Sequence, residues 1–305
     1  MQYFTVFFNG EWLPYGECKL HIDDRAVRLG DAVYDAERTF DGQIFNLEAH
    51  LDRFYRSLAY VRIDPGLTKE EMADISREVV RRNDHLRGAG GDFMVRQIVT
   101  AGSAWSAADR SRPNIYIGAG HLNFKRFAHL YHQGCHVVFA RTRAYHPASL
   151  DAKVKHYSRL NFVLAELEAF DVDPQAWPVL LDHEGNISEG TTFNFGLVKD
   201  GVIHTVGDRN ALQGVSQDTV RKLAEDLGIE VVDGPLRPDD AYDADEAFIS
   251  ATSYCLLPVS KLDSRPSKAG TPGPVVSRLL TAWGELVGFD FVAQARQQAG
   301  IPSPA

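Results

Sequence analysis

Two short turn signals, each set between apolar runs, limit the fold of this chain more than any other feature. Asn9-Gly10 divides the aromatic stretch "YFTVFFNGEWLP", and Asp41-Gly42 divides "FDGQIFN". Asn-Gly and Asp-Gly pairs accept the left-handed backbone that a two-residue hairpin needs. The sequence therefore predicts a β-structured start with two hairpins.

Amphipathic helices alternate with further strands. In "LEAHLDRFYRSLAYVRI" the apolar residues recur at three- and four-residue steps, at Leu47, Leu51, Phe54, Leu58 and Val61. The same period predicts helices in "SRLNFVLAELEAF", "VSQDTVRKLAEDLG" and "GPVVSRLLTAWGELV". Runs such as "FMVRQIVTAG", "CHVVFARTRAY" and "EAFISATS" are typical of strands. This mixture predicts an α+β fold.

The 305 residues are enough for two domains with proper cores. We expect a small N-terminal α/β domain over residues 1–120. A connection over residues 121–134 leads to a larger, strand-rich domain over residues 135–305.

Charge and composition exclude several classes of function. The formal net charge of −9 argues against nucleic acid and anionic membranes as partners. No apolar run has the length of a membrane-spanning helix, and the first residues lack the features of a signal peptide. Cys18, Cys135 and Cys255 are widely spaced and odd in number, so we expect free thiols and a cytoplasmic protein.

Several separated residues have the chemistry of a phosphate site. Arg53 lies on a predicted helix, Val215 and Ser216 begin another, and Thr252 ends a strand. Taken singly, these are a solvated arginine, an ordinary N-cap by Ser216 and a common strand-end hydroxyl. Together, an arginine fork, a helix N-terminus and hydroxyls suit a phosphate monoester.

A lysine and a carboxylate extend this set. Lys155 precedes a helix in "VKHYSRLN", and Glu189 stands in "ISEGTTFN" between two hydrophobic runs. A phosphate-bearing cofactor that works with one lysine and one acid suggests pyridoxal 5′-phosphate (PLP). The lysine would bond the cofactor aldehyde, and the acid would keep the pyridine nitrogen protonated. The alternatives are a surface lysine and a solvated turn carboxylate.

Long motifs in the same order resemble the fold type IV PLP enzymes, the class IV aminotransferases. They are "DRAVRLGDAVYDAERTFDGQIFNLEAHLDRF", "LLDHEGNISEGTTFNFGLVKDGVI", "LQGVSQDTVRKLAEDLGIEV" and "DEAFISATSYCLLPV". The resemblance spans nearly the whole chain. It implies a two-domain PLP enzyme and a homodimer in which a loop of each subunit completes the partner's site.

The resemblance implies a role for each matched residue. Lys155 matches the Schiff-base lysine, with Lys153 a less fitting neighbour, and Glu189 matches the partner of the pyridine nitrogen. The phosphate positions are Arg53, Val215, Ser216 and Thr252. The substrate positions are Tyr34, Arg38, Arg96 and Ser253.

Some residues depart from the pattern of the family. Leu160 stands where branched-chain enzymes have a tyrosine beside the cofactor ring, which leaves Tyr157 or Asn161 to contact the phenolic oxygen. A bulky Tyr254 would narrow whatever pocket lies beside it.

The loop after Gly102 lacks the arginine and histidine pair of D-amino-acid transaminases, although Arg110 and Arg112 remain candidates for the arginine. Arg38 and Arg96 resemble those of branched-chain enzymes. We therefore expect a branched-chain-like amino donor and a 2-oxo acid. The alternatives are a D-amino-acid transaminase, an (R)-selective amine transaminase and aminodeoxychorismate lyase.

Two rival functions come from other classes. His129, His132, Cys135 and His136 are close enough in sequence to suggest zinc. The run crosses a helix end at Gly134 and has no second cluster, so we favour a solvated helix face and expect no metal. A non-catalytic protein that kept only the phosphate cup is disfavoured, since Lys155 and Glu189 are both present.

Overall fold

The computed structural model describes residues 4–88, 91–207 and 210–302. The fold is α+β, as expected, and the chain packs as two units. Unit 1 comprises Met1–Leu122 and Val154–Arg159, whereas unit 2 comprises Asn123–Lys153 and Leu160–Ala305.

A six-stranded sheet forms the centre of unit 1, in the order β2-β1-β6-β5-β3-β4, and these strands pair antiparallel. The strands are β1 (Thr5–Phe8), β2 (Glu11–Pro14), β3 (Ala32–Phe40), β4 (Gln43–Ile44), β5 (Phe93–Thr100) and β6 (Asn114–His121). Both predicted hairpins are confirmed: Asn9-Gly10 joins β1 to β2, Asp41-Gly42 joins β3 to β4, and all four residues have positive φ.

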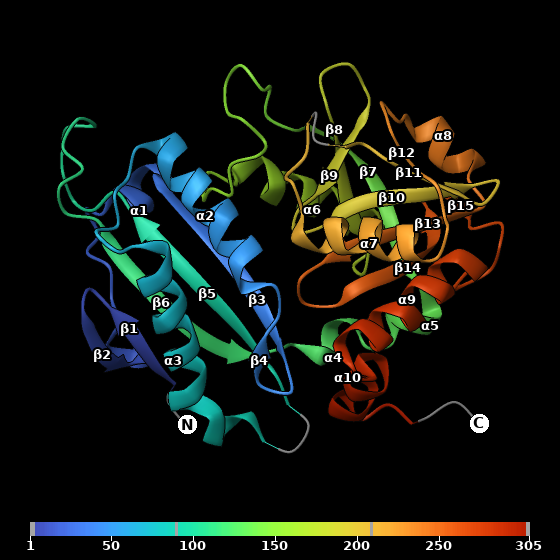
Figure 1. Ribbon diagram of the computed structural model, residues 1–305. Coiled ribbons are helices and arrows are strands. Elements are labelled where there is room, and N and C mark those ends of the chain that lie inside the picture. Colours follow the sequence, from blue (N-terminus) through green and yellow to red (C-terminus); the bar gives the residue numbers. More distant parts are fainter. Residues whose placement is uncertain (1–3, 89–90, 208–209, 303–305) are drawn as a thin grey trace. The chain divides into compact units, whose positions relative to one another are not determined.

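Helices α2 (Leu47–Val61) and α3 (Lys69–Arg87) cover one face of this sheet (Figure 1). Helix α3 begins in a capping box, in which the Thr68 hydroxyl accepts from the Glu71 N–H and the Glu71 carboxylate accepts from the Thr68 N–H. Two short elements, η1 (Tyr15–Glu17) and α1 (Arg25–Leu29), precede β3. The core between helices and sheet is apolar, with members such as Leu51, Phe54, Met72, Phe93 and Val95.

The alternation along β3 separates two sets of side chains. Val33 belongs to the core beneath α2, and Asp35 hydrogen-bonds to α2 side chains. Because successive residues of a strand point to opposite faces, Tyr34 and Arg38 lie on the face away from these helices.

The segment Val154–Arg159 packs with unit 1, although we had expected it in the large domain. It lies along β3: the Tyr34 N–H donates to the Lys155 carbonyl, and the Tyr157 N–H donates to the Ala32 carbonyl, both at 3.0 Å. Hydrogen bonding to the first part of β3, on the side where β4 pairs only with Thr39 and Phe40, therefore outweighs sequence proximity to the second unit.

Unit 2 is built on a nine-stranded sheet in the order β12-β11-β10-β13-β14-β7-β8-β9, with β15 paired to β14. Strand β9 also pairs with β10, so six of the strands close on themselves. The strands are β7 (Cys135–Arg143), β8 (Trp177–Leu181), β9 (Ile187–Gly190), β10 (Asn194–Lys199), β11 (Val202–Thr205), β12 (Val231–Asp233), β13 (Glu246–Ala251), β14 (Cys255–Leu262) and β15 (Arg265–Pro266).

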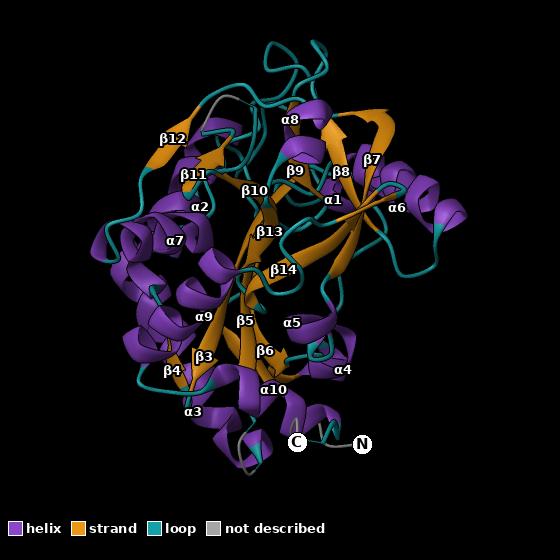
Figure 2. Cartoon of the chain, turned by 90° about the vertical axis from the view of Figure 1, so that its right-hand side faces the viewer, coloured by secondary structure: helices purple, strands orange, loops and turns teal. Residues whose placement is uncertain are grey.

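Helices flank this sheet (Figure 2). Helix α7 (Val215–Asp226) packs against β13 and α9 (Pro274–Val287), and α6 (Leu160–Val172) packs against β7 and β8. The remaining helices are α4 (Phe124–Phe127), α5 (Leu130–Gln133), α8 (Pro238–Asp243) and α10 (Phe291–Ala299).

Helix α6 presents small residues to the sheet and large ones to the outside. Phe162, Ala165 and Ala169 are buried. The apolar side chains that remain exposed are Leu160, Val163, Leu164, Leu167, Phe170 and Val172. In the part of the chain that the structure describes, no helix combines the length and apolar character needed to cross a bilayer.

Candidate active site

Glu189 lies in strand β9, and the turn of "ISEGTTFN" follows it. Its backbone pairs with Asn194 at the start of β10, and the Gly190 N–H closes the turn on the Phe193 carbonyl at 2.9 Å. A Cβ on Gly190 would lie 2.0 Å from the Phe193 ring, so the turn needs glycine there. The stretch therefore holds a half-buried carboxylate on a sheet strand instead of a flexible loop.

The first turn of α7 has the character of an anion site. Gly214 is the N-cap and no side chain caps the helix, so the ordinary N-cap that we considered at Ser216 is wrong. Within the described chain, the buried Nε2 of Gln217 in this same turn has no hydrogen-bond partner. Donors at an uncapped helix N-terminus favour a phosphate.

Asn194, which the sequence analysis missed, joins these two features. Its Oδ1 would lie 1.9 Å from a Cβ on Gly214, so this close approach requires glycine at the start of α7. Its Nδ2 donates to the Leu212 carbonyl at 2.8 Å, just before that turn. Because Asn194 also pairs with Glu189, the carboxylate and the helix N-terminus are fixed to one residue.

The end of β13 reaches the same place. Ser250 of β13 pairs with Asn194, and the predicted residues Thr252 and Ser253 follow in the turn to β14. The residues of unit 2 that we predicted to bind the cofactor or the substrate therefore lie around one end of strands β9, β10 and β13. They are Glu189, Val215, Ser216, Thr252 and Ser253.

Tyr254, from the same turn, does not line a pocket. Its ring is buried, with ring centroids 5.8 Å from those of Trp177 and Phe127, and its carbonyl accepts from the Tyr131 hydroxyl at 2.8 Å. The expectation that it narrows a pocket is therefore wrong, because its large apolar ring is stabilised by packing inside unit 2.

In unit 1, one serine joins the predicted lysine to the predicted arginine. The Ser57 hydroxyl donates to the Arg53 carbonyl at 3.0 Å and accepts from the Lys155 N–H at 3.1 Å. The Lys155 Nζ lies 4.9 Å from the centroid of the Tyr34 ring. Helix α2 thus carries Arg53 and holds the main chain of Lys155 at the same time.

Arg53 is buried and paired. Its Nε donates to Asp35 Oδ2 at 2.9 Å, and its Nη2 donates to Asp35 Oδ1 at 2.7 Å. Burial would raise the pKa of Asp35, but the charge of Arg53 and the hydrogen bonds from His50 and Arg53 outweigh it, so that pKa is lowered. Burial would lower the pKa of Arg53, but Asp35 raises it above the ordinary value. Both groups are therefore ionised.

The predicted substrate residues of unit 1 share one face of its sheet. Tyr34 and Arg38 lie on the face of β3 away from α2, and Arg96 of β5 pairs with Ala36 of β3, which puts Arg96 on that face too. Arg38 is buried, with its guanidinium carbon 4.1 Å from the centroid of the Phe40 ring.

The two candidates for the phenolic-oxygen contact, Tyr157 and Asn161, have different surroundings in the structure. Tyr157 follows Lys155 closely and packs on Tyr34, with ring centroids 4.5 Å apart. Burial, and then the neighbouring Tyr34, raise the pKa of Tyr157 to about 12, so it keeps its proton at neutral pH. Asn161 instead donates to the Arg143 carbonyl at 3.3 Å within unit 2. Leu160 is exposed at the start of α6.

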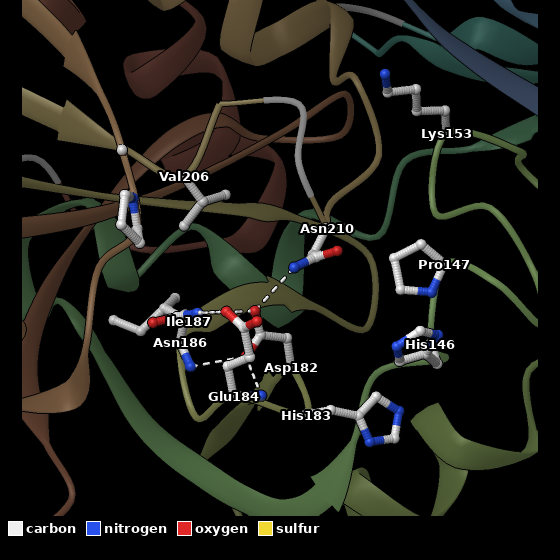
Figure 3. A pocket seen from close by; sticks show the side chains of 12 residues that line it. His146, Pro147, Lys153, Asp182, His183, Glu184, Asn186, Ile187, Val206 and Asn210 are labelled. Carbon is white, nitrogen blue, oxygen red and sulfur yellow. Dashed lines mark hydrogen bonds between the residues drawn. The ribbon is translucent and has the colours of Figure 1, made fainter.

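Lys153, the lysine that matches the family motif less well, lines a pocket of unit 2. This cavity of about 380 Å³ in unit 2 is also lined by His146, Asp182, His183 and Asn210 (Figure 3). The Asp182 carboxylate accepts from the side chains of Asn186 and Asn210 at Oδ2 and from the backbone N–H groups of Glu184 and Asn186 at Oδ1, which together fill its hydrogen-bonding capacity. None of the predicted phosphate residues lines this pocket, which supports Lys155 as the cofactor lysine.

Two of the residues suspected of binding zinc, Cys135 and His136, are buried or engaged inside unit 2. His136 Nδ1 lies 2.7 Å from Asp173 Oδ2, and its Nε2 lies 2.8 Å from the Asp263 carbonyl. Both ring nitrogens are therefore used inside unit 2, and Cys135 is buried with a raised pKa. The only metal-capable group found among the described residues lies elsewhere, at Asp35, Glu37 and His50.

Arg110, a candidate for the carboxylate-binding arginine of D-amino-acid transaminases, is engaged within unit 1. Its Nη1 donates to Asp31 Oδ1 at 3.1 Å, and Asp31 also accepts from Arg25 at 2.8 Å.

Comparison with known proteins gives a consistent family. The profile described as "Amino-transferase class IV" matches residues 32–262. A putative branched-chain-amino-acid aminotransferase of Methanocaldococcus jannaschii is 34% identical over 92% of this chain and 97% of its own length. A D-alanine aminotransferase of Bacillus licheniformis is 29% identical over 91% of this chain and 95% of its own length.

Solved structures show the same fold. A branched-chain amino acid aminotransferase of T.th. with pyridoxamine 5′-phosphate superposes with a TM-score of 0.86 at 28% identity, covering 94% of this chain and 95% of that one. The branched-chain amino acid aminotransferase of Escherichia coli gives a TM-score of 0.87 at 27% identity, with the same coverage.

Proposed function

The chain belongs to the class IV aminotransferase family, and we propose that it moves an amino group between a hydrophobic, branched-chain-like amino donor and a 2-oxo acid, with PLP as cofactor. One observation carries the choice of cofactor: Asn194 fixes both the strand of Glu189 and the uncapped start of α7. A carboxylate and an anion site held in one framework match a ligand that has a pyridine nitrogen and a phosphate.

We assign the phosphate to Arg53, to the backbone of Val215 and Ser216, and to the hydroxyl of Thr252. The fit is supported by the missing side-chain cap of α7 and by the close approach of Asn194 that excludes a side chain at Gly214. Fixed N–H groups and a guanidinium together supply directed, charge-assisted hydrogen bonds.

When bound, the cofactor supplies a conjugated ring that accepts the negative charge developing at the donor α-carbon. Glu189 places a fixed negative charge at the ring nitrogen and so keeps that nitrogen protonated. Lys155 Nζ would take the proton from the donor α-carbon as general base and would give the same proton up again as general acid. Ser57 holds the main chain of Lys155, so the amine can move only as far as the lysine side chain reaches from a fixed backbone.

The substrate positions are Tyr34, Arg38, Arg96 and Ser253. The two arginines and Tyr34 lie on one sheet face of unit 1, which supports their acting on one ligand. A carboxylate of the 2-oxo acid pairs with an arginine there, while the aromatic ring of Tyr34 packs against an apolar donor side chain. Tyr157 is our candidate for the contact with the phenolic oxygen of the cofactor.

We further propose a cytoplasmic homodimer. The thiols of Cys18 and Cys135 form no disulfide bond, which supports a reducing compartment. Self-association is supported by the exposed apolar side chains of α6, because a patch of this kind usually marks a protein interface.

Substrate choice is tested with the purified holoenzyme and a donor panel. Initial rates are compared for L-leucine, D-alanine and (R)-1-phenylethylamine, each with pyruvate or 2-oxoglutarate as acceptor. We expect L-leucine with 2-oxoglutarate to be fastest. A clearly higher rate with D-alanine or with the (R)-amine would refute the branched-chain assignment, but the protein would still be a transaminase. Pyruvate release from aminodeoxychorismate, with no transfer from any donor, would mean a lyase.

A further inference from the structure

Asp35 and Arg53 form a buried, two-point ion pair inside unit 1. Asp35 is 0% exposed and Arg53 is 4% exposed. Both carboxylate oxygens of Asp35 accept hydrogen bonds from the guanidinium of Arg53. Two parallel contacts fix the plane of the guanidinium as well as its position. Arg53 is therefore held in one orientation by a residue that directly follows Tyr34, a predicted substrate residue, on strand β3.

His50 completes the support of Asp35. Its Nδ1 lies 2.8 Å from Asp35 Oδ1, and both residues are buried. Burial lowers the pKa of His50 more than the hydrogen bond and charge of Asp35 raise it. The imidazole is therefore neutral near pH 7 and donates from Nδ1 to the carboxylate.

A second acid beside the pair stays neutral. Glu37 is fully buried, and within the described chain its carboxyl oxygens accept no hydrogen bond. Burial, and then the charge of Asp35, raise the pKa of Glu37 far above its ordinary value. The cluster therefore carries one negative and one positive charge, those of Asp35 and Arg53.

This charge balance argues against a metal ion in the cluster. The ligand atoms of Asp35, Glu37 and His50 lie within 4.8 Å of one another, as a metal site needs. However, the guanidinium of Arg53 already occupies both oxygens of Asp35, and a protonated Glu37 is a poor ligand. The resident cation of the cluster is Arg53.

We propose that Asp35 is the positioning residue for Arg53, holding its guanidinium ready for the phosphate of the cofactor. The proposal rests on the function proposed above. A buried arginine without a counter-charge would be strongly destabilised, and it would turn toward any available carbonyl or solvent. Asp35 compensates the charge and fixes the fork before the phosphate binds, so less side-chain freedom is lost on binding.

The test measures cofactor release from the holoenzyme after dilution, together with the phosphorus NMR signal of the bound phosphate. Asp35→Asn keeps the size of the side chain but loses the charge and one acceptor. We expect release about tenfold faster, the order of one lost charge-assisted contact, and a shifted phosphorus resonance. Glu37→Gln is the matched control in the same cluster, and because Glu37 is already neutral its release rate should equal that of the wild type.

A double-mutant cycle shows whether Asp35 acts through Arg53. In an Arg53→Ala background, Asp35→Asn should add nothing to the release rate. The positioning role alone is overturned if Asp35→Asn speeds cofactor release equally in both backgrounds. It is also overturned if Asp35→Asn leaves the release rate unchanged while Arg53→Ala releases the cofactor quickly. Wild-type retention in Arg53→Ala removes Arg53 from the phosphate site, which contradicts the proposed function first and the positioning role with it.

Arg53→Lys tests the same idea without changing Asp35, should Asp35→Asn fail to fold. Lysine keeps the positive charge but cannot make the two-point fork. Release as fast as in Arg53→Ala supports positioning by the fork. Retention equal to that of the wild type means that charge alone suffices and overturns the proposal.

Discussion

The backbone N–H of Lys155 donates a 3.1 Å hydrogen bond to the hydroxyl of Ser57. That hydroxyl in turn donates to the carbonyl of Arg53, one helical turn back along α2. The serine is buried, so neither contact competes with bulk water. The lysine proposed for proton transfer and the arginine proposed for the phosphate are thereby tied to one turn of one helix.

Removing this hydroxyl should loosen the lysine without removing a reacting group. We expect Ser57→Ala to lower turnover by roughly tenfold, because small displacements of a catalytic group are costly. The unsatisfied Lys155 N–H should lower the free energy of unfolding by about 1–3 kcal/mol. Initial rates and urea unfolding measure both effects.

Ser76→Ala is the control for this change. Ser76 is a buried serine of α3 that donates to the Met72 carbonyl at 2.8 Å and accepts from Gln97 at 2.9 Å. It has the same type of hydrogen bonds but no link to Lys155. A similar loss of stability with normal turnover is expected, and equal losses of turnover in both variants would contradict the role given to Ser57.

Borohydride reduction should identify the cofactor lysine. The reduced holoenzyme is expected to carry the cofactor on the peptide that contains Lys155, because that segment lies in unit 1 beside Tyr34 and α2. Digestion and mass spectrometry locate the adduct, and Lys153→Ala serves as the control that should still be labelled. An adduct on Lys153, which lines the pocket near His146, would show that the motif was aligned wrongly.

Neutralising the proposed partner of the pyridine nitrogen should impair chemistry more than binding. In Glu189→Gln the side chain keeps its size but loses the charge. We expect cofactor retention to persist and turnover to fall by roughly two or more orders of magnitude. Glu184→Gln, in the turn that precedes β9, is the matched control and should keep normal turnover. Near-normal turnover in Glu189→Gln would contradict the role assigned to this carboxylate.

Local signals predicted much of the fold. The left-handed conformations at Asn9-Gly10 and Asp41-Gly42 follow from residue type, because few other pairs accept positive φ so readily. The period of α2 was likewise readable, and its inward residues Leu51 and Phe54 are in the core. These features depend on neighbours in the sequence, which is why the sequence reveals them.

Features that depend on distant pairing could not be read in this way. The return of residues 154–159 to β3 depends on backbone hydrogen bonds, which leave no side-chain pattern. Asn194 and Ser57 act through contacts across the fold, and each looks like an ordinary polar residue in sequence. The interior position of the Tyr254 ring depends on packing, which the sequence does not show.

A buried, protonated Glu37 should give the stability of the protein a characteristic dependence on pH. Its pKa is raised in the folded protein, so above the ordinary value of 4.5 the unfolded chain releases a proton that the folded chain retains. The free energy of unfolding therefore decreases as pH rises, by up to about 1.4 kcal/mol per pH unit, until the folded pKa is reached.

Glu37→Gln should remove this dependence of stability on pH, since an amide does not titrate. The free energy of unfolding of the variant, minus that of the wild type, should grow as pH rises from about 5 to 8. Urea unfolding at several pH values measures the difference. Parallel curves for the two proteins would mean that Glu37 is ionised in the folded state.

Arg96 offers a separate test of the substrate face. It lies beside Ala36 on the sheet face that also carries Tyr34 and Arg38, and its side chain is exposed in the described chain. Arg96→Gln keeps much of the apolar stem but loses the charge, so a dicarboxylate should suffer most. We expect KM for 2-oxoglutarate to rise about tenfold, as for one lost charge-assisted contact, while KM for L-leucine and cofactor retention change little.

Arg77→Gln, an exposed arginine of α3 on the opposite side of the sheet, is the control and should leave both KM values unchanged. A change confined to KM for 2-oxoglutarate indicates a carboxylate contact present in both the ground state and the transition state. A fall in kcat with unchanged KM would instead place Arg96 at the reacting centre. Unaltered kinetics with both substrates would remove Arg96 from the proposed substrate site.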